Sequence, residues 1–266
     1  MRVITGLILI LLTMGTAQAQ LAVPNEAGLT YGHVHLNVSD IELHKRLWVE
    51  HFGGTVVQKG SLTAVRMPNM AVILTERVPT GGSQGTVMDH FGFKVRSIAT
   101  FLAKWRAAGL PVGREFIGAE GQRNAYIMMP DDVYVELQED QMLDLEVSPY
   151  HIHFFTAEYE SLLQWYSQLL NIEVRPRGSI ESTTNVPGMN LSFGNANEER
   201  LPTKGRSIDH IGFEVDDLEA FCKLLEEKGI AFDVAYRDIP SIGLKIAFIT
   251  DPTGVYIEFT EGLDEY

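Results

Sequence analysis

Four stretches of the chain repeat the same order of hydrophobic and polar positions. Each opens with alternating apolar and polar residues, the period of a β-strand with one buried face. An amphipathic helix follows, and three short apolar runs typical of strands come after it. The pattern therefore predicts four β-α-β-β-β modules. The final run of each module is the clearest, and these runs are Met70–Leu74, Val133–Leu137, Met189–Phe193 and Val255–Phe259.

The opening runs share residues as well as pattern. Residues 89–95 (Asp-His-Phe-Gly-Phe-Lys-Val) and 209–215 (Asp-His-Ile-Gly-Phe-Glu-Val) are near copies. Residues 31–38 and 150–155 fit the same frame less closely. Each run carries a histidine, and these framing histidines are His33, His90, His151 and His210. Their near-equal spacing indicates a chain built by internal repetition.

The helices have predictable ends. In the first module Ser39 or Asp40 is expected to cap the helix, and Gly53-Gly54 to end it. Gly109 and Gly229 are expected to end the helices of the second and fourth modules.

A single module is too small to bury both faces of its sheet, so the modules are expected to pair. The predicted fold class is α+β, with four βαβββ modules paired into two cup-shaped half-barrel sheets and the helices outside. Chain order favours pairing of neighbours, which gives an N-terminal domain (31–147) and a C-terminal domain (148–266) after a lead-in of residues 20–30. The alternative is an intertwined arrangement that pairs module one with four and two with three.

The first 19 residues are typical of a signal peptide. Met1-Arg2 gives a positive start, Val3 to Thr13 is apolar but short for a membrane span, and Ala17-Gln18-Ala19 has the form of a cleavage site. A periplasmic or secreted protein, free of the membrane after cleavage, is therefore expected. The alternative is a retained N-terminal anchor.

Charge and cysteine content narrow the function classes. The chain carries a formal net charge of −14, which disfavours nucleic acid and anionic membrane surfaces as partners. The 45% apolar composition is that of a globular protein, and a monomer or homodimer that binds a small-molecule substrate is expected. The single cysteine, Cys222, lies at helical spacing among leucines and a phenylalanine, which indicates a buried apolar role.

Closing strands of two modules carry a matching carboxylate. The run Asp132-Val-Tyr-Val-Glu-Leu137 and the run Gly254-Val-Tyr-Ile-Glu-Phe259 place Glu136 and Glu258 in the same frame. The corresponding positions of modules one and three are Ile73 and Ser192.

With neighbouring modules paired, each cup would hold two histidines and one glutamate. The first set would be His33, His90 and Glu136, and the second His151, His210 and Glu258. Two imidazoles and one carboxylate make a three-ligand site with open positions, suited to divalent Fe, Mn, Ni or Zn. The alternative is that the histidines are packed or hydrogen-bonded and the glutamates pair with arginines.

Further polar residues share the predicted cup faces. His35 and His153 follow a framing histidine by two residues, so they point to the same face. They could hydrogen-bond to the ligands, serve as alternative ligands or act as acid–base groups. Tyr134 and Tyr256 precede the glutamates by two residues and could orient substrate, donate a proton or simply pack. Residues expected near the rims are Arg123, Asn124, Tyr236 and Arg237.

In these motifs the chain resembles the vicinal oxygen chelate superfamily, which includes glyoxalase I, fosfomycin- and bleomycin-resistance proteins and extradiol dioxygenases. The most specific stretches are residues 209–215 and 247–258. The resemblance implies that the framing histidines and closing-strand glutamates bind the metal. The chain departs from glyoxalase I, because Ile73 and Ser192 replace a further ligand. It departs from the dioxygenases near Pro240–Gly243 and Phe248, where a histidine and a tyrosine are lacking.

The leading hypothesis is an exported metal-dependent enzyme, glyoxalase-like or dioxygenase-like, that acts on a small oxygenated substrate. Tyr256 or His153 would transfer protons in the second cup, and Tyr134 or His35 in the first. The alternative is a non-catalytic binding or sequestration protein of the bleomycin-resistance type. A degenerate structural copy is a third possibility. The glycine-rich Gly81–Gly85 stretch lacks the continuation of a phosphate loop, so no nucleotide site is expected.

Overall fold

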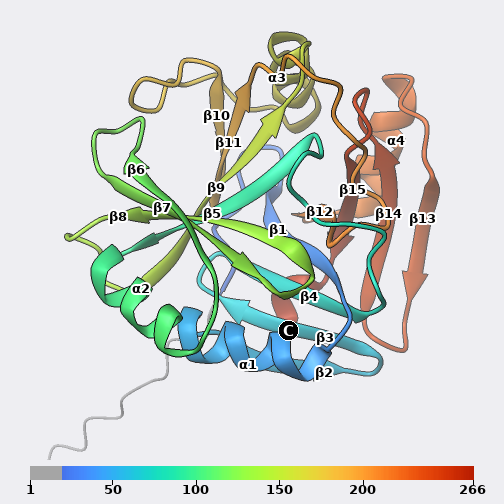
Figure 1. The fold of residues 1–266 in the computed structure, drawn as a ribbon. Helices are drawn as coiled ribbons and strands as arrows, with labels where there is room; N and C mark the ends of the chain where they lie inside the picture. Colours follow the sequence, from blue (N-terminus) through green and yellow to red (C-terminus); the bar gives the residue numbers. More distant parts are fainter. Residues whose placement is uncertain (1–19) are drawn as a thin grey trace, which may run out of the picture.

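The computed structural model describes residues 20–266, so the predicted signal segment lies outside the described residues. Four helices and two mixed sheets make up the described part (Figure 1). The helices are α1 (Ile41–Phe52), α2 (Ile98–Ala107), α3 (Tyr159–Leu170) and α4 (Leu218–Glu227). Each lies directly after the opening strand of its module, so the predicted repeat and the α+β fold class are confirmed.

One sheet has eight strands in the order β13-β14-β15-β12-β1-β4-β3-β2. Module one contributes β1 (Leu29–Val38), β2 (Thr55–Lys59), β3 (Leu62–Met67) and β4 (Met70–Glu76). Module four contributes β12 (Ile208–Val215), β13 (Val234–Ile239), β14 (Leu244–Thr250) and β15 (Tyr256–Glu261).

The other sheet has seven strands in the order β10-β11-β9-β5-β8-β7-β6. Module two contributes β5 (Met88–Val95), β6 (Val112–Ile117), β7 (Arg123–Met129) and β8 (Val133–Glu139). Module three contributes β9 (Val147–Phe155), β10 (Thr183–Val186) and β11 (Met189–Gly194). Short 3₁₀ turns, η1 (Pro130–Asp132) and η2 (Leu263–Glu265), follow β7 and β15.

The favoured pairing of neighbouring modules is wrong, and the intertwined alternative is confirmed. Strand β1 pairs antiparallel with β12, and β5 pairs antiparallel with β9. The boundary at residues 147 and 148 therefore separates two modules that share one sheet. Linker length gives the physical reason: residues 140–146 are enough only to return the chain to the same sheet, whereas residues 77–87 and 195–207 carry it between sheets.

The helices cover the apolar faces of the sheets, and their buried side chains belong to one shared core. In module one Asp40, rather than Ser39, caps α1 by accepting a hydrogen bond from the Leu43 amide. Gly53 ends that helix in the left-handed region, at φ 71°, where glycine has no steric cost. The Trp48 ring on α1 lies about 6 Å from the rings of Phe91 and Phe93 on β5 of the other sheet. The core is therefore continuous between the two sheets.

Module three lacks the first of its three expected closing strands. Between α3 and β10 the chain forms only isolated bridges, one of them between Val174 and Thr184. Pro176 lies in this segment, and proline has no amide proton to donate to a strand ladder. The segment instead forms a loop that directs Arg177 toward the sheet.

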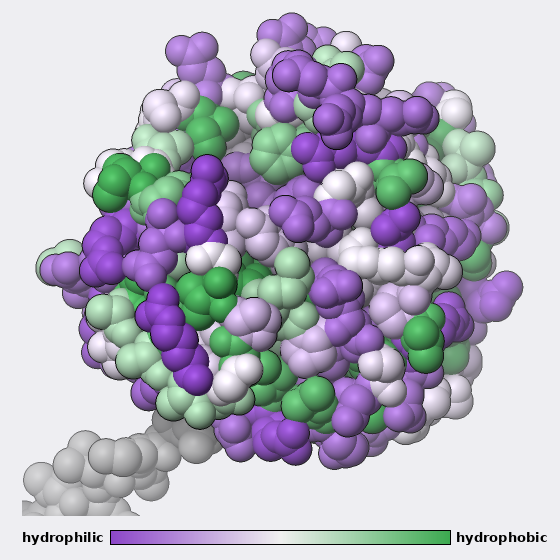
Figure 2. All heavy atoms as spheres, viewed as in Figure 1, coloured by the Kyte–Doolittle hydropathy of each residue, from purple (hydrophilic) through white to green (hydrophobic). Residues whose placement is uncertain are grey.

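One face of the molecule is mostly polar. Figure 2 shows hydrophilic residues over most of the viewed face, with apolar residues in small separate patches. Cys222 is buried in α4, as expected. Among residues 20–266, no helix has the length and apolar character needed to cross a bilayer.

Candidate metal centres

Each sheet has one face turned away from the helices, and a histidine–glutamate cluster lies on it. We call these faces the one–four cup and the two–three cup, after the modules that form them. In the one–four cup, His33 on β1 lies opposite Gly212 on β12, and Gly212 lies beside Glu258 on β15. In the two–three cup, Gly92 on β5 lies in the same way between His151 and Glu136.

These two glycines make room for the imidazoles. A Cβ atom added at Gly212 would lie 2.0 Å from Cε1 of His33, and one at Gly92 would lie 2.4 Å from the His151 ring. Both contacts are far inside van der Waals range, so neither site accepts a side chain without displacing the histidine. The glycine of the Asp-His-x-Gly-Phe motif thus belongs to the cluster, a role that the sequence analysis missed.

In the one–four cup, two histidines converge on one carboxylate oxygen. Nε2 of His210 lies 3.0 Å and Nε2 of His33 lies 2.9 Å from Glu258 Oε2. The His33 contact lacks the alignment of a hydrogen bond, and both of its ring nitrogens are buried without a hydrogen-bond partner. Nδ1 of His210 is fixed by Asp209, 2.6 Å away. Three possible metal-binding atoms, one each from His33, His210 and Glu258, therefore point to a common position, and Asp209 fixes the orientation of the His210 ring.

The two–three cup repeats this geometry. Nε2 of His90 lies 2.9 Å and Nε2 of His151 lies 3.3 Å from Glu136 Oε2. Asp89 holds Nδ1 of His90 at 2.9 Å, as Asp209 holds that of His210. The other oxygen of Glu136 accepts a hydrogen bond from the Asn124 amide at 2.5 Å. Carboxylates behind a ligating histidine are typical of metal sites, because they fix the tautomer and raise ligand basicity.

Protonation in the two clusters follows from this geometry. Burial disfavours the charged form of His90 and of His210, but hydrogen bonds from each to its aspartate and glutamate outweigh burial and raise each pKa to about 9. Burial opposes ionisation of Glu136, but His151 and His90 hold its pKa well below the usual value. Each cluster without metal is thus an ion pair, and a metal ion would take the place of the shared proton.

The donors fit a divalent metal ion. Ligand atoms of His33, His210 and Glu258 lie within 4.8 Å of one another, and so do those of His90, Glu136, His151 and His153. The two buried clusters are consistent with divalent metal sites of the two-histidine, one-carboxylate type. The six residues predicted as ligands therefore all lie in the clusters. Their predicted grouping is wrong, because His33 joins His210 and Glu258, and His151 joins His90 and Glu136.

The residues predicted as acid–base groups lie beside the clusters. His153 stacks on the His90 ring at 4.8 Å, and His35 lies 4.4 Å from the His210 ring. The rings of Tyr134 and Tyr256 each lie 5.6 Å from the framing histidine of their cup. Nε2 of His35 contacts Thr75 Oγ1 at 2.8 Å. Their catalytic roles stay predictions.

Arg177 is a cup residue that the sequence analysis missed. Its Nη2 donates to Nε2 of His153 at 3.1 Å and to Ser192 Oγ at 3.1 Å, and its Nη1 pairs with Glu120 at 2.8 Å. Because arginine only donates, His153 accepts at Nε2 and carries its proton on Nδ1. Burial, His90 and His151 lower the pKa of His153 well below its usual value, so this ring is neutral. No sequence pattern in the loop around Pro176 indicated that Arg177 would point into the cup.

The predicted rim residues divide into two kinds. Asn124 was expected at a rim, but it is 3% exposed and binds Glu136 inside the two–three cup, because its position on β7 faces the cluster. Arg123 is exposed and pairs with Glu115 at 3.3 Å. Arg237 is exposed and Tyr236 half-buried on β13.

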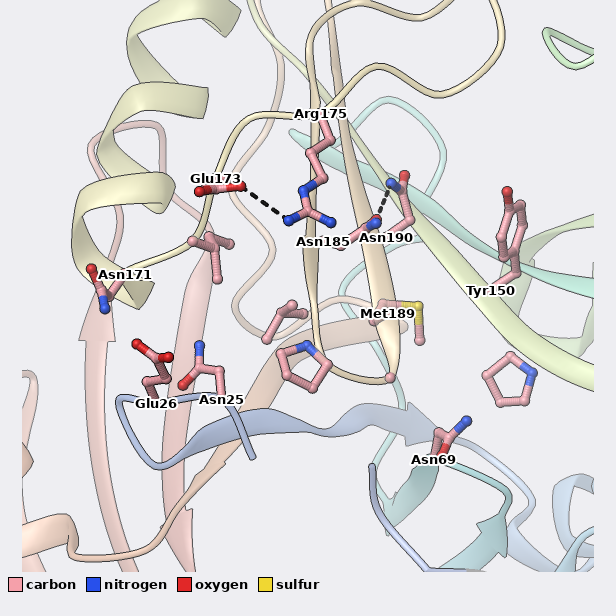
Figure 3. Close-up of a pocket in the computed structure, with 15 residues that line it drawn as sticks. Asn25, Glu26, Asn69, Tyr150, Asn171, Glu173, Arg175, Asn185, Met189 and Asn190 are labelled. Atoms are coloured by element: carbon pink, nitrogen blue, oxygen red, sulfur yellow. Dashed lines mark hydrogen bonds and ion pairs between the residues drawn. The ribbon is translucent and has the colours of Figure 1, made fainter. Parts of the chain in front are cut away.

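A cavity of about 390 Å³ opens beside the two–three cluster. Its lining includes Asp89, His90, Arg114, Tyr126, Tyr134 and Phe155, together with Arg200. A larger cavity of about 610 Å³ lies away from both clusters, between the N-terminal lead-in and module three (Figure 3). Figure 3 shows asparagines on its walls, and one of them, Asn171, ends α3. The smaller cavity is the one that reaches the candidate chemistry.

Comparison with known proteins agrees with this architecture. Residues 149–259 match the family model described as the Glyoxalase/Bleomycin resistance protein/Dioxygenase superfamily. Curated proteins give no match. Glyoxalase I from Zea mays has a similar structure, with a TM-score of 0.68 and 18% identity over 89% of this chain and 94% of that chain. A Bacillus subtilis protein provisionally assigned as a dioxygenase has a TM-score of 0.68 and 10% identity over 91% of this chain and 86% of that chain. At these identities the structural likeness establishes the fold.

Proposed function

We propose that this chain is a metal-dependent enzyme of the Glyoxalase/Bleomycin resistance protein/Dioxygenase superfamily, whose model matches residues 149–259, and that it acts on a small oxygenated molecule. The observation that carries the proposal is the convergence of His90, His151 and Glu136 beside an accessible cavity. Divalent Fe, Mn, Ni or Zn suits this donor set. The reaction would be a glyoxalase-like lyase or isomerase reaction or a dioxygenase-like reaction.

The two–three cup is the proposed working site. His90 lines the cavity, whereas the one–four cup is filled below its cluster by Leu263 and Tyr266, which pack on Ile73. Polar groups also surround the two–three cluster, among them Asn124 and Arg177. A substrate that presents adjacent oxygens needs such partners, because a buried polar atom without a hydrogen bond is costly.

Residues of this cup have separable roles. A divalent ion held there would supply Lewis-acid stabilisation of negative charge on a substrate oxygen. Asp89 orients the His90 ring by accepting from Nδ1, which leaves Nε2 directed at the cluster. Burial raises the pKa of Tyr134 to about 12, so its phenol keeps its proton at neutral pH and would donate to a substrate oxygen. His153 is neutral, and its Nε2 already accepts a hydrogen bond from Arg177. This nitrogen would accept a substrate proton only after the hydrogen bond from Arg177 is broken.

The metal test compares matched variants of the two cups. We expect Glu136→Ala to lose metal from the two–three cup and to lower turnover by at least about a thousandfold, because the variant lacks one of three donors. Glu258→Ala should lose the one–four metal and keep turnover. Elemental analysis of purified protein and a rate assay make the measurement. If native protein contains no stoichiometric metal, the proposal fails. Loss of turnover in Glu258→Ala alone would assign the work to the other cup.

The reaction test separates the two chemistries. Protein loaded aerobically with Fe(II) should consume oxygen with a catechol if the reaction is dioxygenase-like. Protein loaded with Ni(II) or Zn(II) should convert the adduct of methylglyoxal and a thiol if it is glyoxalase-like. Ligand-dependent protection from heat without turnover or metal dependence would instead favour sequestration.

We further propose that the protein is exported to the periplasm or secreted. The sequence of residues 1–19 supports export. Gln20, the residue that cleavage would leave first, already accepts a hydrogen bond from the Asn69 amide at 3.0 Å, so the remaining chain is attached to the fold from its start. Mass spectrometry of the protein from its native host should give an N-terminus at Gln20, and an intact Met1 would contradict cleavage.

A further inference from the structure

Aromatic rings and two arginines surround the mouth of the two–three cup. The rings of Tyr126 and Tyr134 stack at 4.6 Å with an interplanar angle of 18°, and the His90 ring meets both edge-on. The Phe155 ring lies 6.1 Å from that of His90. The cavity of about 390 Å³ falls in the lower part of the range for small-ligand sites. Its walls therefore suit a small, flat molecule.

Arg200 contributes one partly used guanidinium to this mouth. Its Nη1 donates to Asp89 Oδ2 at 3.1 Å, and its guanidinium lies 5.4 Å above the Phe155 ring. Its Nε is buried and has no hydrogen-bond partner among the described residues. Since an unsatisfied buried donor is costly, this group is suited to an incoming acceptor.

Arg114 contributes a second guanidinium. It stacks at 4.7 Å above the Phe116 ring and lies 6.0 Å from that of Tyr126. The neighbouring carboxylate of Glu115 pairs with Arg106 and Arg123, and within residues 20–266 Arg114 has no carboxylate partner of its own. The stacking holds this cation on the aromatic wall without neutralising its charge.

We infer that the two–three cup takes a small planar carboxylate, such as an aromatic or conjugated acid. Its carboxylate would bind Arg114 and Arg200, and its ring would pack on Phe155 and Tyr126. An oxygen at its other end would then reach the histidine–glutamate cluster. The role of this recognition in catalysis rests on the proposed function, but binding of the carboxylate does not.

Two acidic residues at the same mouth sharpen the inference. Glu198 and Glu199 also line the cavity, and both are exposed. Solvent screens exposed charges, so these carboxylates weaken anion binding without preventing it. Their removal should therefore strengthen binding of a carboxylate and leave a neutral ligand unaffected.

The test uses two probes of the same shape that differ in charge, benzoate and benzamide. Titration calorimetry on the purified metalloprotein should give at least about tenfold tighter binding for benzoate. Arg114→Met and Arg200→Met should each weaken benzoate about tenfold and leave benzamide within about twofold, while Glu199→Gln strengthens benzoate. Arg237→Met, at an exposed arginine of β13, is the matched control. Arg114 has no carboxylate partner, so its variant stays informative if Arg200→Met disturbs Asp89.

Glu136→Ala distinguishes the arginines from the metal as the carboxylate site. Preference for benzoate that persists in this variant supports the inference, even if native protein holds no metal and the proposed function fails. Preference that vanishes with Glu136 means that the carboxylate binds the metal, which overturns the inference. Equal binding of the two probes to a metal-loaded protein overturns it as well and leaves the proposed function standing.

Discussion

The two cups hold the same donors and differ in the side chains around them. Ile73 lies beside His35 of β1 in the one–four cup, and Ser192 lies beside His153 of β9 in the two–three cup. The paired position on the next strand is Ala64 in the first and Thr183 in the second. The one–four cup is therefore apolar below its cluster, and the two–three cup is polar.

The cups also differ in the segment that fills them. Leu263 and Tyr266, which follow β15, pack into the one–four cup, and the Tyr266 hydroxyl donates to the Ile242 carbonyl at 2.8 Å. The two–three cup instead receives Arg177, which donates hydrogen bonds to Asn190, His153 and Ser192. The presence of the same donor residues in both cups is thus not sufficient to identify the proposed working site. Access and polar surroundings separate a cluster that can meet substrate from one that is enclosed.

The largest effect is expected from filling the space beneath one imidazole. Gly92→Ala puts a methyl group where the His151 ring lies, at 2.4 Å, and should destabilise the fold by about 1–3 kcal/mol. It should also weaken metal binding in the two–three cup by more than about a hundredfold, since the histidine donor itself is displaced, not a residue that only orients it. Chelator competition and chemical denaturation make the two measurements.

Gly212→Ala is the matched control in the other cup. It should cause a similar loss of stability, because its Cβ would lie 2.0 Å from His33, but it should spare turnover. Full metal binding and turnover in Gly92→Ala would show that the glycine motif serves the backbone alone.

Much of this architecture follows from the sequence. The modules, their final strands and all six residues of the histidine–glutamate clusters were predictable, because each depends on a pattern inside one module. The favoured pairing was wrong and only the alternative was right, since all four opening strands carry the same alternation and any two could form an antiparallel pair. Two features distinguish the pairs. One is the short linker 140–146, and the other is the pair of glycines at positions 92 and 212, because the space beside each glycine is filled by a histidine ring from the neighbouring strand.

Other parts of the site depend on tertiary contacts. Asn124 looked like a loop residue until β7 placed it opposite Gln138, facing Glu136. Arg177 lies in a loop that closes against module two, where the Ser179 amide donates to the Ala119 carbonyl at 3.0 Å. Contacts of this kind form between modules, so no pattern within a single module encodes them.

A smaller effect is expected from the aspartates behind the framing histidines. Asp89→Asn removes the charge that helps raise the pKa of His90 to about 9, so that pKa should fall. Metal must displace this proton, so affinity in the wild type should rise with pH up to about 9, and in the variant it should level off at lower pH. At neutral pH, loss of the oriented, basic partner should still weaken metal binding about 10–100-fold.

Asp209→Asn is the corresponding variant in the one–four cup. It tests a different environment, because Asp209 binds the neutral Asn37 amide at 3.0 Å where Asp89 binds Arg200. The pH profile of metal affinity, measured for each cup in the background that lacks the other glutamate, is the readout. Identical pH profiles in wild type and Asp89→Asn would contradict a role for the aspartate in tuning the histidine.

The smallest effect on metal binding and turnover concerns the segment that encloses the one–four cup. Glu214 on β12 corresponds to Lys94 on β5, which reaches Asp140 at 2.9 Å. Glu214 is instead buried and accepts hydrogen bonds from the amides of Gly262 at 2.6 Å and Leu263 at 2.9 Å, so it anchors that segment. Burial raises the pKa of Glu214 from its usual 4.5 to about 7, against the effect of these hydrogen bonds.

The sign of the pH effect follows from that raised pKa. The folded protein holds the Glu214 proton more tightly than the unfolded chain, so its contribution to stability is fully present below pH 4.5 and falls as pH rises to about 7. Glu214→Gln cannot ionise and should flatten this part of the profile, a difference of about 3 kcal/mol or roughly 6–12 °C in Tm. Thermal denaturation between pH 4 and pH 8 measures it, with the exposed Glu265→Gln as control. If the Glu214→Gln profile matches the wild type, burial of this carboxyl does not set the pH dependence. In that case the enclosure of the one–four cup depends on Leu263 and Tyr266 alone.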